Sequence, residues 1–541
     1  MRDFFIYIFL GLAFVSFGQK TKYTHADSIK GKITKEREWW NVLHYDLNVS
    51  FNPSDSIIKG RNKITFKALT SGRTLQIDLQ APMVLDSVLQ AGKKRVWKKD
   101  GDAYFVELNV AIDKSITENI ITYFHGKPHV AKIPPWDGGL IWKKDKNKNP
   151  WISIACQGMA GSVWFPCKDH MYDEPDSTRF TIENVPEGLV AVSNGRLKAA
   201  NENSNGSASY VWEVKNPINN YNIIPYIGKY VHFSDTIMGE KGELKLNYWV
   251  LDYNLEKAKQ QFKQTKSMLH CFEYWFGPYP FYEDEYKLVE APHLGMEHQS
   301  AVAYGNGYVN GYMGRDLSLT GWGLKWDFII VHESGHEWFG NNISVKDVAD
   351  NWVHEGFTAY SENLYTEYLF GKKAGAEYVI GTRKSVMNDK PVIGDYEVNN
   401  DGSGDKYYKA SNMLHTIRYI LNNDSIWRAF LRDINKTFYH QTVSTKQVEE
   451  FMISYLKLDL QKVFDQYLRT TQIPVLQYKL KKGKLSYRWA NCVEGFNMPL
   501  RINTSKGSLM LKPTTQFQDV KIKSTAFGPD ENYYIEIAKI N

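Results

Sequence analysis

The segment Val331-His-Glu-Ser-Gly-His-Glu-Trp-Phe-Gly340 carries the most informative pattern in this chain. His332 and His336 are four residues apart, so on a helix their side chains project from one face about one turn apart. Two neutral imidazoles in this arrangement can bind one Zn²⁺ ion. Glu333 follows the first histidine and is close enough to accept a proton from a metal-bound water. The segment therefore predicts a metal-binding helix with a general base beside it.

A third ligand is predicted further along the chain. Eighteen residues separate His336 from Glu355, which lies in Trp352-Val-His-Glu-Gly-Phe-Thr-Ala-Tyr360. Two antiparallel helices joined by a loop would place Glu355 beside the histidines. Two histidines and one glutamate leave a fourth position for water, which is the arrangement of a catalytic zinc site. We therefore expect one Zn²⁺ ion, bound by His332, His336 and Glu355.

This ligand pattern resembles that of the gluzincin aminopeptidases, the family of aminopeptidase N and leukotriene hydrolase. The segment His293-Leu-Gly-Met-Glu-His-Gln299 resembles the family's exopeptidase motif G-x-M-E-N. Met296 and Glu297 are in register with that motif, and Gly295 precedes them. Leu294 and His298 depart from it, at the positions of the first glycine and the final asparagine. The resemblance implies that Gly295, Met296 and Glu297 bind substrate, and that the Glu297 carboxylate holds the free α-ammonium group.

Two further segments resemble the same family. Tyr407-Tyr-Lys-Ala410 is similar to the family's Y-x-K-G, which places Tyr407 at the catalytic tyrosine. Gln157 falls where the family has a substrate-binding glutamine. The resemblance implies that Glu333 acts as the general base and that Tyr407 stabilises the developing oxyanion. Asp347, Asp350 and Glu362 are all candidates to orient the histidines, and the sequence does not choose between them.

The pattern along the chain predicts a multidomain α+β protein. Period-two alternation with Gly, Asn, Asp and Pro punctuation indicates β-structure from about residue 36 to 250. Helical spacing follows, at 254–275, 324–339, 353–369, 411–421, 445–456 and 460–468, and short alternating strands return near 473. The expected units are 1–18, 19–250, 251–470 and 471–541. The family resemblance implies a β-sandwich or saddle domain, a thermolysin-like, mainly helical zinc catalytic domain, and a small C-terminal β domain.

The N-terminus favours export. Phe4 to Phe17 form a largely apolar run of 14 residues after Arg2, and small residues lead to a cleavage position after Gly18. These features are typical of a signal peptide, and the run is too short to span a bilayer comfortably. We therefore expect no stable membrane insertion and a periplasmic or secreted location.

The charge and the cysteine content do not suit a nucleic-acid-binding protein or a disulfide-stabilised protein. The chain has 66 basic and 60 acidic side chains, for a net charge of +6. Its lysine clusters are short and mixed, and no nucleic-acid-binding motif accompanies them, so a nucleic-acid partner is not expected. Four cysteines are too few for a disulfide scaffold, and the sequence leaves open whether Cys156 and Cys167 are bridged.

These observations predict a zinc metalloaminopeptidase that hydrolyses the N-terminal peptide bond of peptides with a free N-terminus. One alternative is a thermolysin-type zinc endopeptidase, which would cleave N-acetylated and free peptides equally. Another is a secreted binding protein with a relict site, although the complete set of chemical groups argues against it. The preferred first residue and the oligomeric state are left open.

Overall fold

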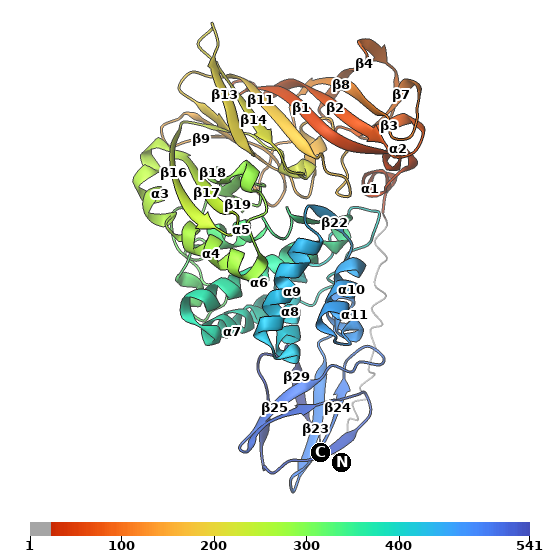
Figure 1. Cartoon of the computed structure of the whole chain (residues 1–541), viewed down its shortest axis with the longest axis vertical. Helices are drawn as coiled ribbons and strands as arrows, with labels where there is room; N and C mark the ends of the chain where they lie inside the picture. The colour runs from red at the N-terminus through yellow and green to blue at the C-terminus, as the bar shows by residue number, and fades with distance from the viewer. Residues whose placement is uncertain (1–22, 541) are drawn as a thin grey trace, which may run out of the picture.

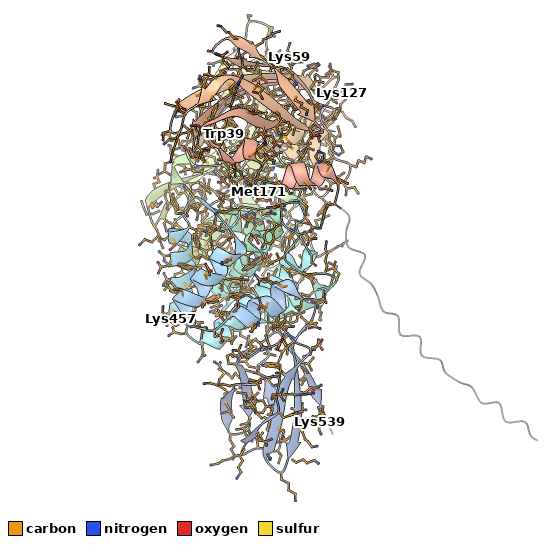
Figure 2. The ribbon with its side chains drawn as sticks, turned by 90° about the vertical axis from the view of Figure 1, so that its right-hand side faces the viewer. Trp39, Lys59, Lys127, Met171, Lys457 and Lys539 are labelled. Carbon is orange, nitrogen blue, oxygen red and sulfur yellow. The ribbon has the colours of Figure 1, made fainter. Side chains whose placement is uncertain are left out.

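The computed structural model describes residues 23–540 and has three parts stacked along its long axis (Figure 1). A large β domain lies at one end, a mainly helical part in the middle and a small β domain at the other end. Figure 2 shows the same order after a quarter turn. The predicted multidomain α+β architecture is therefore confirmed. The predicted signal peptide, residues 1–18, lies outside the described residues.

The N-terminal domain is built on an eight-stranded sheet in the order β13-β14-β11-β1-β2-β8-β4-β5. Side chains of β1 alternate between buried and partly exposed, and Trp40, Leu47 and Val49 are among those on the buried face. A four-stranded sheet (β12-β15-β10-β9) and a three-stranded sheet (β3-β7-β6) share this hydrophobic core. The elements of this domain are α1 (His25–Gly31), α2 (Lys35–Glu38), β1 (Trp40–Asn52), β2 (Ile57–Ala68), β3 (Gly72–Asp78), β4 (Val84–Gln90), β5 (Lys93–Arg95), β6 (Trp97–Asp100), β7 (Ala103–Ile112), β8 (Thr117–Gly126), β9 (Gly139–Lys144), β10 (Pro150–Ala155), β11 (Ser177–Val185), β12 (Val190–Val192), β13 (Arg196–Glu202), β14 (Ala208–Val214) and β15 (Tyr226–Gly228).

The middle part contains a five-stranded sheet in the order β16-β17-β18-β20-β19, flanked by helices. β17 pairs in parallel with β18, so the β16–β17 hairpin, residues 230–251, belongs to the sheet that carries the site rather than to the N-terminal β domain. β19 lies at the edge of this sheet. The elements are β16 (Tyr230–Gly239), β17 (Gly242–Leu251), α3 (Leu255–Gln261), α4 (Gln264–Phe276), β18 (Tyr286–Glu290), β19 (Gly295–Met296), β20 (Val302–Tyr304), α5 (Phe328–Gly335), β21 (Ile343–Val345), α6 (Trp352–Phe370), α7 (Lys372–Gly381), α8 (Tyr408–Leu421), α9 (Asp424–Thr437), β22 (Gln441–Val443), α10 (Thr445–Leu456) and α11 (Gln461–Arg469).

Helix α5 is short and entirely buried. Asp327 caps its N-terminus by accepting hydrogen bonds from the backbone N–H groups of Ile329 and Ile330. Gly335 allows α6 to approach closely, because a Cβ atom there would lie 2.6 Å from Oγ of Ser361. This approach brings the two helices that carry the predicted metal ligands into contact.

The C-terminal domain consists of a four-stranded sheet (β27-β24-β23-β29) and a three-stranded sheet (β26-β25-β28). Its buried side chains, including Trp489 and Phe496, continue the hydrophobic core of the helical part. Within residues 23–540, we find no helix whose length and hydropathy would suit a bilayer span. The strands are β23 (Val475–Lys481), β24 (Lys484–Ala490), β25 (Leu500–Thr504), β26 (Gly507–Leu511), β27 (Gln518–Lys521), β28 (Phe527–Pro529) and β29 (Glu536–Lys539).

Candidate metal centre and active site

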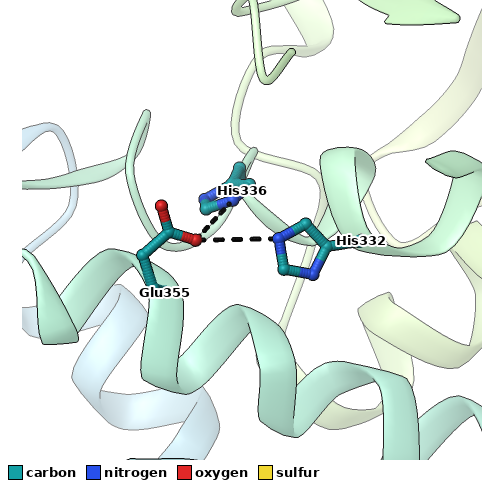
Figure 3. A group of neighbouring side chains, drawn as sticks. All are labelled: His332, His336 and Glu355. Atoms are coloured by element: carbon teal, nitrogen blue, oxygen red, sulfur yellow. Dashed lines mark ion pairs between the residues drawn. The ribbon is translucent and has the colours of Figure 1, made fainter. Parts of the chain in front are cut away.

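Two helices bring the three predicted metal ligands together (Figure 3). α5 supplies His332, His336 follows as its C-cap residue, and the first turn of α6 supplies Glu355. The Oε2 atom of Glu355 lies 3.3 Å from Nε2 of His336 and 3.6 Å from Nε2 of His332. All three side chains are buried. One ion can therefore contact a donor atom from each of them, since these atoms all lie within 4.8 Å of one another.

The two imidazoles are oriented through their Nδ1 atoms. Nδ1 of His332 lies 2.7 Å from Oε1 of Glu362, whose Oε2 accepts a hydrogen bond from Tyr378. Nδ1 of His336 lies 2.9 Å from the carbonyl oxygen of Phe339. Because these acceptors take the Nδ1 protons, each Nε2 faces Glu355, with which it forms an ion pair here, and would offer its lone pair to a metal ion that displaces the Nε2 proton. This arrangement is the one that a metal ion requires.

Only one of the three proposed orienting carboxylates contacts a ligand histidine. Glu362 does so. Asp347 instead accepts hydrogen bonds from the backbone N–H groups of Ala349 and Glu397. Asp350 accepts hydrogen bonds from side-chain hydroxyls, including that of Tyr396. Both aspartates therefore stabilise the loop around α6 rather than the histidines.

The state of Glu355 also fits a metal ion. Its Oε1 accepts a hydrogen bond of 3.0 Å from the Tyr407 hydroxyl, whereas its buried Oε2, ion-paired with the two imidazoles, has no hydrogen-bond partner within residues 23–540. Burial alone would raise the pKa of Glu355, but the adjacent histidines lower the pKa well below its usual value, so the carboxylate is ionised. A buried, ionised oxygen without a hydrogen bond is costly unless a cation neutralises it. Two imidazole nitrogens and this oxygen form a donor set suited to Zn²⁺.

A second group of donor atoms shares His336 with the first. It contains Glu297, Glu333 and His336, again within 4.8 Å of one another. Because imidazole nitrogen is a preferred Zn²⁺ ligand, the set with two histidines is the better metal site. Glu297 and Glu333 are then left beside the metal, where they can act on protons and substrate.

Glu333 has the environment of a general base. Burial raises its pKa to about 7, against the opposing effect of His332 and His336. Gly295 on β19 faces it, and a Cβ atom at that position would lie 2.6 Å from Oε1 of Glu333. Only glycine therefore lets the edge strand come this close to the carboxylate.

Glu297 is held by two side chains. Nε2 of Gln157 donates a hydrogen bond of 2.6 Å to its Oε1, and the hydroxyl of Tyr221 donates one of 3.0 Å to the same atom. Tyr221 was not among the residues expected from the sequence, because it lies on a short 3-10 turn, Asn220–Asn222, outside any recognised motif. Its buried position and its bond to Glu297 are visible only in the fold.

Tyr407 stands at the N-terminal end of α8, beside the ligand set. Its ring stacks on His332 with the centroids 5.9 Å apart. Burial raises the pKa of Tyr407 well above its usual value, and the nearby Glu355 raises it further. The hydroxyl therefore keeps its proton and acts as a hydrogen-bond donor.

His298, which departs from the family motif, turns away from the metal. It is fully buried, and its Nδ1 lies 2.7 Å from the hydroxyl of Tyr226, which donates its own proton to the carbonyl oxygen of Ala301. His298 therefore donates from Nδ1 and supports the segment behind Glu297 rather than lining the cavity.

A single cavity of about 580 Å³ joins these groups. All nine site residues expected from the sequence line it, namely Gln157, Gly295, Met296, Glu297, His332, Glu333, His336, Glu355 and Tyr407. The cavity is large enough for the end of a peptide. Cys156, which directly precedes Gln157, and Cys167 are buried free thiols in this structure.

A comparison with protein families matches the part of the chain that carries the candidate metal ligands. Residues 253–467 match the Peptidase family M1 domain. Leukotriene A-4 hydrolase of Xenopus laevis is 24% identical over 78% of this chain and 69% of its own length. Aminopeptidase B of Mus musculus is 22% identical over 71% of this chain, which spans only 56% of that protein.

Solved structures share the fold. An M1 zinc metallopeptidase from Deinococcus radiodurans superposes with a TM-score of 0.69 at 20% identity, covering 82% of this chain and 96% of that structure. A mutant of the Deinococcus enzyme, bound to a Tyr-Ser-Ala substrate, gives a TM-score of 0.65 at 19% identity, covering 80% of this chain and 95% of that structure. The match identifies residues 253–467 as a peptidase family M1 domain, and with the metal centre it makes this chain a zinc metallopeptidase, consistent with the gluzincin aminopeptidase family that its motifs resemble.

Proposed function

We propose that this chain is an aminopeptidase, which hydrolyses the first peptide bond of peptides with a free N-terminus. The observation that carries the proposal is the position of Glu297. Its carboxylate lies within 4.8 Å of donor atoms of Glu333 and His336, in the cavity that contains the metal ligands. A peptide whose α-ammonium binds this carboxylate has room for one residue before its first carbonyl reaches the metal centre. Only the first peptide bond then meets the catalytic groups.

The cavity also offers a way to bind the peptide backbone. β19 pairs with β20 on one side, and it is the last strand in the order of its sheet. An extended peptide can add to such a free edge through main-chain hydrogen bonds. Because Gly295 and Met296 of β19 line the cavity, a peptide on this edge passes directly beside Glu333.

In the proposed mechanism, His332, His336 and Glu355 would hold a Zn²⁺ ion, which would supply Lewis-acid polarisation of the scissile carbonyl and increase the acidity of the attacking water. Glu333 accepts a proton from the attacking water and passes it to the leaving amine. With its pKa raised to about 7, this carboxyl can both take up and release a proton near neutral pH. The Tyr407 hydroxyl, 3.0 Å from Glu355, donates a hydrogen bond to the developing oxyanion, which is commonly worth about 3 kcal/mol.

A panel of aminoacyl fluorogenic amides, offered with free and with N-acetylated amino groups, tests this proposal. We expect hydrolysis of the free substrates alone, and its loss after treatment with a chelator. Equal cleavage of both forms would favour an endopeptidase and reject the role of Glu297. No cleavage of any substrate by the zinc-loaded protein would favour the binding-protein alternative.

The related proteins support the choice of substrate class. Of the two relatives described above, one is named aminopeptidase B and the other leukotriene A-4 hydrolase, and a neighbouring structure was solved with a Tyr-Ser-Ala substrate. We also propose export to the periplasm or medium, on the basis of the apolar run at Phe4–Phe17. N-terminal sequencing of the mature protein tests this, because cleavage after Gly18 would leave Gln19 first.

A further inference from the structure

An open groove continues from the catalytic cavity along the surface. It has a volume of about 440 Å³, and Trp136 and Leu294 line both the cavity and the groove. Its other walls include Ile133, Trp151 and Met313. The site therefore extends beyond the groups that the proposed reaction uses.

The wall that carries Trp136 is a loop held by hydrogen bonds within the loop itself. The carboxylate of Asp137 accepts hydrogen bonds from the backbone N–H groups of Lys132 and Ile133 at 2.6 and 2.9 Å. The backbone N–H of Trp136 donates a hydrogen bond of 3.0 Å to the carbonyl oxygen of Ile133. This loop holds the two side chains toward solvent, with Ile133 64% and Trp136 66% exposed. Large apolar side chains held on the rim of a cleft are typical of a binding surface.

The other wall is fixed by a buried asparagine. Oδ1 of Asn306 accepts a hydrogen bond of 2.8 Å from the backbone N–H of Met313. The amide nitrogen of Asn306 also bonds the side chain of Asp327, which caps α5. Met313 is 57% exposed. The groove thus has apolar side chains on two walls that are anchored independently, one of them to the helix that carries the metal ligands.

The direction of a bound peptide follows from what lies on either side of Glu297. The residues directly after Glu297, beginning with His298, do not line the cavity, whereas Leu294, Gly295 and Met296 do, so the cavity extends along the residues before Glu297. The residues before it lead through Gly295 to Leu294 and into the groove. A peptide anchored at Glu297 therefore runs antiparallel to β19. At about 3.3 Å per residue, its third and fourth residues lie roughly 7 and 10 Å beyond the first, toward Leu294 and the groove.

We propose that the surface formed by Ile133, Trp136, Leu294 and Met313, here called the apolar groove, binds the third and fourth residues of the substrate and prefers apolar or aromatic side chains there. This inference rests on the proposed aminopeptidase function. The only charged group we find among the described lining residues is basic, that of Lys143, whose Nζ bonds the carbonyl oxygen of Pro292. The groove therefore offers no carboxylate to attract a basic substrate residue.

A set of tetrapeptides provides the test. All of them share the same first residue, chosen from the amide panel, and have alanine as the second residue. One carries glycine at both later positions, and two others carry phenylalanine at the third or the fourth position. We expect at least one phenylalanine peptide to have a kcat/KM about five- to tenfold higher than that of the glycine peptide, mainly through KM. Trp136→Ala should reduce this ratio to about one, and Trp136→Phe should restore part of it.

Matched measurements separate the possible failures. Met238→Ala removes another exposed apolar side chain, 72% exposed and outside the groove lining, and should keep the wild-type ratio. Calorimetric binding of the same peptides in a Glu333→Gln background should show the same preference without turnover. Equal kcat/KM for all tetrapeptides, or an unchanged ratio in Trp136→Ala, would overturn the proposed role of the apolar groove but not the proposed aminopeptidase function. Failure to hydrolyse any free aminoacyl amide or peptide would overturn both.

Discussion

Tyr221 donates a hydrogen bond of 3.0 Å to Oε1 of Glu297, the same oxygen that Gln157 binds at 2.6 Å. Tyr221 is 2% exposed and comes from the N-terminal β domain, whereas Glu297 follows the edge strand of the catalytic sheet. The proposed ammonium-binding carboxylate is therefore fixed by two residues of another domain. Substrate anchoring thus depends on how these two domains pack.

Tyr221→Phe should weaken binding of the substrate N-terminus. A hydrogen bond to a charged group contributes about 1.5–3 kcal/mol, so kcat/KM for free aminoacyl amides should fall roughly 10- to 100-fold, mainly through KM. Steady-state kinetics measure this change. Tyr210→Phe is the matched control, because its hydroxyl bonds the carbonyl oxygen of Leu189 in the same domain and should leave KM unaltered. An equal effect of both changes would point to general destabilisation instead.

Glu333→Gln should abolish turnover without removing the metal. The amide cannot accept the proton of the attacking water, so kcat should fall by about 10²–10⁴-fold. Elemental analysis should still find one zinc per chain, because Glu333 is not in the ligand set. His336→Ala should instead lose both zinc and activity. Turnover by Glu333→Gln at the wild-type rate would rule out its role as the base.

Glu362 and Asp347 allow a direct test of which carboxylate orients a ligand. Glu362→Gln weakens the acceptor for Nδ1 of His332, and loss of such a partner typically costs about 10- to 100-fold in metal affinity. Asp347→Asn changes a carboxylate that accepts hydrogen bonds from the backbone N–H groups of Ala349 and Glu397, so the zinc affinity of this variant should match the wild type. Competition with a chromophoric chelator measures both affinities. Similar values for the two variants would mean that Glu362 does not tune the histidine.

The local patterns in the sequence were sufficient to predict that the three donor side chains of the proposed metal site lie together. His332 and His336 share a helical face at a fixed spacing, and the second helix brings Glu355 to them. The outline of strands, helices and strands also follows from periodicity. Helix α9 was not among the expected helices, although Trp427, Phe430 and Ile434 have helical spacing and are buried.

Contacts between distant segments could not be predicted in the same way. Tyr221 and Glu297 are 76 residues apart, and no local sequence pattern indicates that a tyrosine on a short turn binds Glu297. Among Asp347, Asp350 and Glu362, sequence distance gives no preference, because the choice depends on the packing of α6 against α5. The β16–β17 hairpin has the same alternation as the preceding strands, so its membership of the catalytic sheet depends on a pairing that only the fold shows.

Gly295→Ala should impair catalysis while preserving the metal site. The added Cβ would lie 2.6 Å from Oε1 of Glu333 and 3.0 Å from Cδ1 of Ile329, so either the edge strand or the carboxylate must move. A displacement of about 1 Å at a catalytic group can cost roughly 100-fold in rate. We therefore expect kcat to fall by about this factor, with zinc content and thermal midpoint near those of the wild type. Gly158→Ala is the matched control, because that glycine lines the same cavity but has open space at its Cβ position. Equal kcat values for the two variants would show that β19 tolerates the methyl group, and that its close approach to Glu333 is not needed for the reaction.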